Sequence, residues 1–149
     1  MFHRPTTAWA LLPLLVLSVL PSFAQQATTT AVAVPPPLVS LNGQTLSALT
    51  SPPLLIAGVV MVPLNDFIDT IGGELTADAT STRFTLRRGN AILTFALNQA
   101  PFQLGTQVGT FDRPPVKLGE VVYIEAEELV EALGGQYAWN KATLTAELS

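Results

Sequence analysis

The sequence predicts an α+β domain made of two fused repeats, each with short β-hairpins and one helix, and with the helices packed on antiparallel sheet. Two patterns support this fold class: motifs recur at a constant spacing over residues 38–149, and in each copy strand-like stretches precede one amphipathic helix. The composition, 48% hydrophobic and 12% charged, suits a chain that forms a core.

The recurring motifs are separated by 62 residues. The matched pairs are Pro52-Pro53 with Pro114-Pro115, Val60 and Val62 with Val122 and Ile124, Gly72-Gly73 with Gly134-Gly135, and Asp78 with Asn140. We expect repeat one to span about 38–88 and repeat two about 100–149. Because either copy alone is small, we expect the two to share one core.

The first repeat opens with an Asn42-Gly43 hairpin turn and a second strand over 59–62. Pro63 is suited to the first position of a helix, where its missing N–H costs nothing. The helix presents one apolar face, made by Leu64, Phe67, Ile68 and Ile71. Gly72-Gly73 is expected to end the helix by supplying a left-handed residue.

The second repeat follows the same order. Strands are expected over 116–118 and 121–124, then a helix from about 125 to 133 that Gly134-Gly135 ends. The positions off the helix's apolar face carry Glu125, Glu127, Glu128 and Glu131, which we interpret as a solvated face. A last hairpin, with strands over 136–139 and 142–146, is expected around Asn140-Lys141.

The clearest hairpin lies between the two copies. Residues 83–88 and 91–97 flank the two-residue turn Gly89-Asn90. This loop length places Leu86 opposite Leu93 and Phe84 opposite Phe95, so that both apolar pairs share one face. The second strand is apolar on both faces, which predicts a central position in its sheet.

Residues 1–24 are typical of a signal peptide, with His3-Arg4 before an apolar stretch and small residues up to Ala24. A membrane anchor is the alternative, although the apolar stretch is shorter than the ~20 residues that a span needs. Residues 25–37, which end in three prolines, predict an extended linker. We therefore expect export to the periplasm or cell surface, with no transmembrane span after cleavage.

The composition excludes several classes of chemistry. There is no cysteine, and the single histidine, His3, lies in the predicted signal peptide, so no transition-metal site, catalytic residue or cofactor is predicted. The formal charge of −4 argues against a nucleic-acid partner. Carboxylates could still bind a hard cation weakly. Asp78 and Asp112 could serve a carbohydrate hydrolase or its inhibitor by residue type alone, but Asp78 is more typical of a turn.

Two groups of side chains are candidates for binding. Arg83 and Arg87 share the solvent face of their strand and could meet an anionic wall polymer or another subunit, with a solvated edge as the alternative. The aromatic side chains Tyr123, Tyr137 and Trp139 could form a stacking platform, or could belong to the core.

Taken together, the motifs resemble the copper amine oxidase N-terminal-like, or stalk, domain. The resemblance rests on Leu41-Asn42-Gly43, Met61-Val62-Pro63-Leu64, Ile71-Gly72-Gly73, Asp112-Arg113-Pro114-Pro115, Leu133-Gly134-Gly135 and Trp139-Asn140-Lys141-Ala142-Thr143. Two positions depart from the pattern: Glu125-Ala126 stands where Pro-Leu is expected, and Ala77 where an aromatic residue is expected.

The resemblance implies a non-catalytic module of the cell envelope, distant from any metal centre. Its partners would be cell-wall polymer, a surface-layer protein or components of an outer-membrane complex. The alternative is an accessory subunit or metal-associated component of an envelope oxidase or antioxidant system.

Overall fold

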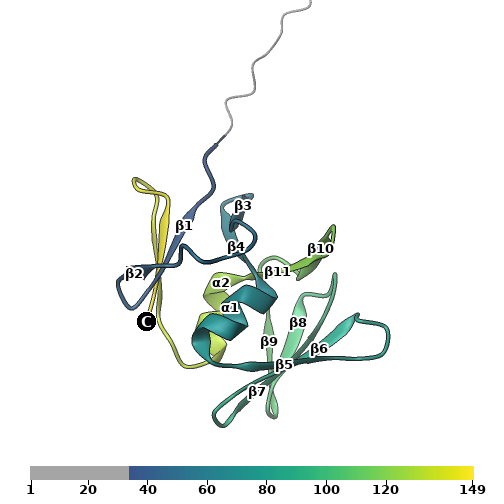
Figure 1. Ribbon diagram of the computed structural model, residues 1–149. Coiled ribbons are helices and arrows are strands. Elements are labelled where there is room, and N and C mark those ends of the chain that lie inside the picture. The colour runs from purple at the N-terminus through teal and green to yellow at the C-terminus, as the bar shows by residue number, and fades with distance from the viewer. Residues whose placement is uncertain (1–33) are drawn as a thin grey trace, which may run out of the picture. The chain divides into compact units, whose positions relative to one another are not determined.

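The computed structural model describes residues 34–149, which form one compact unit. The predicted signal peptide and the linker up to residue 33 lie outside the described residues. None of the helices in residues 34–149 is long and apolar enough to cross a membrane. The unit contains three β-sheets and two short helices, which places it in the α+β class (Figure 1).

Sheet B brings together the two β-β-α regions of the chain. Its strand order is β10-β11-β4-β3, and every pair in it is antiparallel. The central pair joins β4 to β11, with Val62 opposite Ile124. Each central strand runs directly into a helix, so that both helices pack against this sheet. The elements are β3 (Leu54–Ile56), β4 (Val59–Pro63), α1 (Leu64–Ile71), β10 (Val116–Leu118), β11 (Val121–Glu125) and α2 (Ala126–Ala132).

Sheet C is a five-stranded antiparallel meander. Its strands, in both chain and spatial order, are β5 (Glu74–Ala77), β6 (Arg83–Arg88), β7 (Ala91–Ala96), β8 (Pro101–Leu104) and β9 (Gln107–Thr110). The predicted register is confirmed, since Leu86 lies opposite Leu93 and Phe84 opposite Phe95. The Phe84 and Phe95 rings stack with their centroids 5.5 Å apart. As the apolar pattern predicted, β7 is the central strand.

Sheet A joins the two ends of the described chain. Its order is β12-β13-β1-β2, from strands β1 (Leu38–Leu41), β2 (Gln44–Thr45), β12 (Tyr137–Asn140) and β13 (Thr145–Leu148). The expectation of antiparallel sheet alone is wrong here, because β1 and β13 pair in parallel. Parallel partners need a long crossover between them, and in this fold the rest of the domain supplies it. Pairs of this kind carry no local sequence signal.

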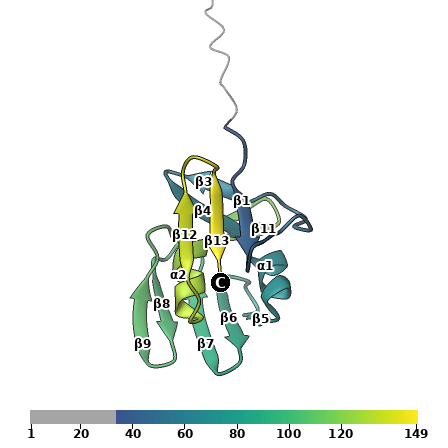
Figure 2. The ribbon, with the colours of Figure 1, turned by 90° about the vertical axis from the view of Figure 1, so that its left-hand side faces the viewer.

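A single hydrophobic core connects the three sheets and the two helices. In Figures 1 and 2 the helices lie between sheet A and sheet C. Fully buried core residues come from every layer: Val39, Val62, Phe67, Leu86, Leu93, Ile124, Leu129 and Leu148. Both β-β-α regions therefore contribute to one core, as the small size of each led us to expect.

The predicted boundaries differ from the observed ones in three places. Pro63 ends β4 and precedes the helix, which begins at Leu64. The second helix begins at Ala126, and the last strand only at Thr145, after a four-residue loop that Asn140 organises through the N–H groups of Ala142 and Thr143. The hairpin of β8 and β9 was not predicted, because its strands are short and alternate weakly.

The predicted helix stops and turn are confirmed. Gly72 and Gly134 take left-handed φ values of 69° and 81°. The next glycine of each pair, Gly73 or Gly135, donates its N–H to a helix carbonyl, that of Ile68 or Val130. Gly89, with φ of 56°, and Asn90 form the turn between β6 and β7.

Candidate functional site

The predicted aromatic residues lie in two different sheets. Tyr123 is buried in β11, and its hydroxyl donates to the Pro52 carbonyl at 3.3 Å. Tyr137 and Trp139 lie on β12 and pack, half-buried, against the core. Burial, together with the negative charges of Glu127 and Glu125, raises the pKa of Tyr137 to about 12. These contacts give each ring a packing role, and the three do not meet on one surface.

The outer face of sheet C carries a continuous row of side chains. We call the four polar positions Thr76, Thr85, Thr94 and Gln103 the polar row. Each lies directly opposite the next on the neighbouring strand, and Val108 follows Gln103 on β9. The inner face carries the buried residues of the same strands, because successive side chains alternate between faces. Together with Val108, the polar row crosses all five strands, a span of roughly 19 Å at 4.8 Å per strand.

Arg83 and Arg87 lie on this same face, as predicted for the solvent side of β6. Both are exposed, and they flank Thr85 at a separation of roughly 13 Å along the strand. Glu74 stands opposite Arg87 in the register, yet neither guanidinium makes an ion pair or a hydrogen bond within residues 34–149. Arg88 points elsewhere, since its Nε donates to the Ile71 carbonyl at the end of α1.

A hollow of about 250 Å³ lies at the β7–β9 end of the polar row. It combines a cation and amide donors with an apolar surface. Its lining includes Arg83, Thr94, Ala96, Gln99, Gln103 and Val108. The volume is below the roughly 300–1,000 Å³ typical of pockets for drug-sized ligands.

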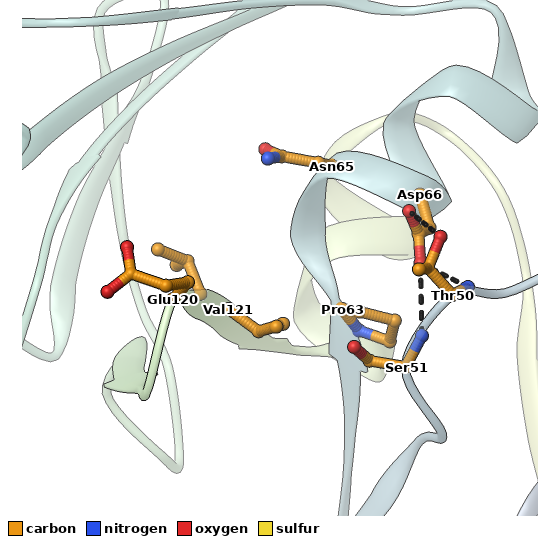
Figure 3. Close-up of a pocket in the computed structure, with 8 residues that line it drawn as sticks. Thr50, Ser51, Pro63, Asn65, Asp66, Glu120 and Val121 are labelled. Carbon is orange, nitrogen blue, oxygen red and sulfur yellow. Dashed lines mark hydrogen bonds between the residues drawn. The ribbon is translucent and has the colours of Figure 1, made fainter.

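A second hollow, of about 170 Å³, lies beside the start of α1 (Figure 3). Asp66 and Glu120 are its carboxylates, and Figure 3 shows them on opposite sides. The Asp66 carboxylate accepts hydrogen bonds from the N–H groups of Thr50 and Ser51, at 2.7 and 3.4 Å. Glu120 forms an ion pair with Lys117 at 3.6 Å. Both carboxylates thus have structural partners, and the hollow holds no paired acid and base.

The acidic stretch over β11 and α2 differs from its prediction at Glu125, the last residue of β11. Glu127 and Glu131 are exposed and Glu128 is half-buried, but Glu125 is only 1% exposed, so the expectation that it belongs to a solvated face is wrong. Its carboxylate accepts the Arg113 N–H at 3.0 Å. Burial raises the pKa of Glu125, an effect that the Arg113 N–H opposes and the charge of Asp112 strengthens.

The remaining carboxylates offer no metal-binding group. Burial and the charge of Glu131 raise the pKa values of Glu127 and Glu128. Within residues 34–149 no three His, Cys, Asp or Glu side chains are placed to hold a metal ion. Asp78 organises a turn, as predicted, by accepting the N–H groups of Thr82 and Arg83 at 2.9 and 3.1 Å. These hydrogen bonds, with that of Thr80, lower the pKa of Asp78.

The sequence offered a signal for part of the outer face. The register that places Leu86 opposite Leu93 also places Thr85 opposite Thr94, so half of the polar row could have been identified from the hairpin alone. Gln99 and Gln103 could not, because they belong to the unpredicted stretch between β7 and β9.

A search of curated proteins found no significant match. The family model for the copper amine oxidase N-terminal domain matches residues 40–148. This is typically a non-catalytic module of surface or secreted proteins, and the match covers nearly all of the described unit. The chain belongs to the copper amine oxidase N-terminal domain family.

Proposed function

We propose that the protein is an exported, non-catalytic module of the cell envelope that binds an anionic wall or surface polymer through the outer face of sheet C. The observation that carries this proposal is the polar row, beside two guanidinium groups that form no ion pair with a carboxylate of residues 34–149.

Charge favours an anionic partner. The whole chain has a formal charge of −4, and Arg83 and Arg87 are exposed cations on the outer face of sheet C that form no ion pair within residues 34–149. Successive anionic groups of one polymer would pair with the two guanidinium groups separately, since guanidinium binds carboxylate and phosphate in a bidentate manner. Exposed charges are screened by salt, so the binding should weaken as ionic strength rises.

Shape favours a polymer. Hydroxyl and amide groups repeat at the strand spacing across the sheet, and each can exchange hydrogen bonds with a hydroxyl-rich chain. The hollow at the end of the row would receive one unit of that chain, with the carbon skeleton against Ala96 and Val108 and an acidic group at Arg83.

Sedimentation of the protein with polygalacturonate, with neutral dextran as the reference polymer, tests this function. We expect binding to the anionic polymer alone and at least a tenfold loss of affinity in the Arg83→Gln/Arg87→Gln double variant. The matched control, Lys117→Gln/Lys141→Gln, also removes two exposed cations but leaves sheet C unchanged. Equal losses in both double variants, or equal binding to dextran, would contradict the proposed site.

Export has a separate test. The mass of the protein isolated from the envelope fraction should correspond to a chain that begins at Gln25, after cleavage following Ala24. An intact N-terminus on envelope protein would instead support the anchor alternative.

A further inference from the structure

We propose that sheet C extends into a second copy of this chain by antiparallel pairing of the two β9 strands. The pairing would be symmetric about Gly109, and it rests on the geometry of the sheet edge independently of any polymer. The resulting dimer would join two outer faces into one surface.

Strand β9 is an exposed edge without the usual protection. Gln107, Val108, Gly109 and Thr110 include no charge and no proline, and Val108 is 70% exposed. Natural edge strands usually carry charges, prolines or bulges that prevent pairing with other chains. The opposite edge of sheet C follows this rule, since β5 begins with Glu74. In Figure 2, no other strand lies beyond β9 at its end of the sheet.

The hydrogen-bonding direction of β9 is fixed by its hairpin. The Gly105 N–H donates to Ile92 on β7, so the alternate residues Phe102 and Leu104 direct their backbone groups toward β9. Their partners in the register are Gly109 and Gln107. The bond from the Phe111 N–H to the Ala100 carbonyl, at 2.8 Å, continues the same alternation.

Val108 and Thr110 therefore direct their N–H and C=O groups away from β8. In a pairing centred on Gly109, Val108 of each copy would lie opposite Thr110 of the second copy and exchange N–H···O=C bonds with it. The two Gly109 residues would face each other, where strands approach most closely. Gly109 has no side chain that could obstruct this approach, and the ring of Phe102 covers its inner side.

The edge is better suited to a second copy than to an unrelated strand. Its hydrogen-bonding groups are self-complementary about Gly109. No like charges would meet across the pair despite the formal charge of −4, since Gln107–Thr110 is neutral. The pairing also continues the row on the outer face, because Val108 of one copy would lie beside Thr110 of the other.

Cysteine cross-linking tests the register. The chain contains no cysteine, so Val108→Cys and Thr110→Cys variants would each carry a single thiol. In the proposed pairing, position 108 lies roughly 5.5 Å from position 110 of the second copy, within disulfide range, whereas equal positions lie beyond about 7 Å. Mixing the two variants under mild oxidation should give several-fold more cross-linked dimer than either variant alone. Equal yields in the mixture and the separate samples would overturn the register.

Sedimentation equilibrium of the full chain tests the association itself. Val108→Lys places a charge on the edge and should shift the protein to monomer. Gln103→Lys, which adds the same charge to the same face one strand inward, should leave the dimer intact. A wild-type monomer at all concentrations, or association that is unchanged by Val108→Lys, would overturn the proposal.

Discussion

In the β3-β4-α1 region the loop ahead of the first strand is held by Asp66, whereas in the β10-β11-α2 region the corresponding loop is held by Glu125. The two regions are otherwise closely matched, since β4 begins at residue 59 and β11 at 121, 62 residues later, and α1 begins at 64 and α2 at 126. Descent from one duplicated unit stays a prediction.

The difference follows from the residue that precedes each helix. Pro63 has no side-chain acceptor, so the loop's N–H groups at Thr50 and Ser51 bind a carboxylate on the first turn of α1. In the second region Glu125 occupies the position that corresponds to Pro63, and its own carboxylate accepts the Arg113 N–H. The same loop is thus fixed by a half-buried carboxylate in one region and by a buried one in the other. In both regions the loop's backbone N–H groups have a carboxylate acceptor, but a different residue supplies it.

The largest effect should come from the matched core positions Phe67 and Leu129. Both are 0% exposed and belong to the one hydrophobic core. Phe67→Ala and Leu129→Ala should each lower the free energy of unfolding by about 4 kcal/mol. Because the core is shared, each variant should still unfold in one transition, with coincident midpoints by circular dichroism and by the fluorescence of Trp139. Two separate transitions would show that the regions fold independently.

Alanine substitution of the second glycine of each helix stop should destabilise the protein by different amounts in the two regions. A Cβ at Gly135 would lie 2.7 Å from the Ser149 carbonyl and from a Val130 methyl, whereas at Gly73 the nearest atom is an Ile68 methyl at 3.0 Å. Gly135→Ala should therefore cost about 3 kcal/mol and Gly73→Ala about 1 kcal/mol, measured by urea denaturation. Costs in the reverse order would contradict this account of the packing.

Substitution of Glu125 should show the cost of its burial. Glu125→Ala leaves the Arg113 N–H without its acceptor and should lower stability by about 2 kcal/mol at a pH where the carboxyl is neutral. Glu125→Gln retains an acceptor and cannot ionise. Burial raises the pKa of Glu125, with Asp112 and Glu128 adding repulsion, so the folded state holds the proton more tightly than the unfolded state.

The sign of the pH effect follows because the folded state holds the Glu125 proton more tightly than the unfolded state. This contribution to wild-type stability is present below the ordinary glutamate value of 4.5 and is lost as the pH rises through the raised pKa of the folded state. Glu125→Gln cannot ionise, so it should remove this loss of stability with rising pH. The plot of urea midpoint against pH should then be flatter above the ordinary glutamate value. A profile unchanged by Glu125→Gln would show that burial of the Glu125 carboxyl does not make stability depend on pH.

Local signals in the sequence predicted most of the local structure. Helix faces, glycine stops and the β6–β7 register are set by neighbouring residues, and all three were predicted correctly. The parallel pairing of β1 with β13 depends on contacts between the two ends of the chain, so no local pattern reports it. The burial of Glu125 also escaped prediction, because the predicted helix included it in an acidic stretch, where glutamates are normally solvated, whereas it ends β11.

The candidate site also combines features that local sequence patterns predicted with features that only the tertiary fold determines. Arg83 and Arg87 were placed correctly on the solvent face by alternation within one strand. The polar row needed the register of four strands, β5 to β8, and β8 was not predicted. Tyr123, Tyr137 and Trp139 have the residue types of a stacking platform, but their places in different sheets follow only from the tertiary fold.

The smallest effect should come from exchanging the turn residues Asp78 and Asn140, which occupy corresponding places in the two regions. Each accepts backbone N–H groups with its side-chain oxygen. Those hydrogen bonds lower the pKa of Asp78, so its contribution to stability is present above the ordinary value of 3.8 and is lost as the pH falls through the lowered pKa.

Asp78→Asn should therefore remove this dependence, and the gap in Tm between wild type and variant should narrow as the solution is acidified. Asn140→Asp is the reciprocal exchange and should introduce the same dependence into the second region, because the new carboxylate would accept the N–H groups of Ala142 and Thr143. Thermal unfolding of both variants over a series of acidic buffers measures the two effects. A gap that stays constant for Asp78→Asn would mean that the turn is held by its backbone geometry and not by the charge.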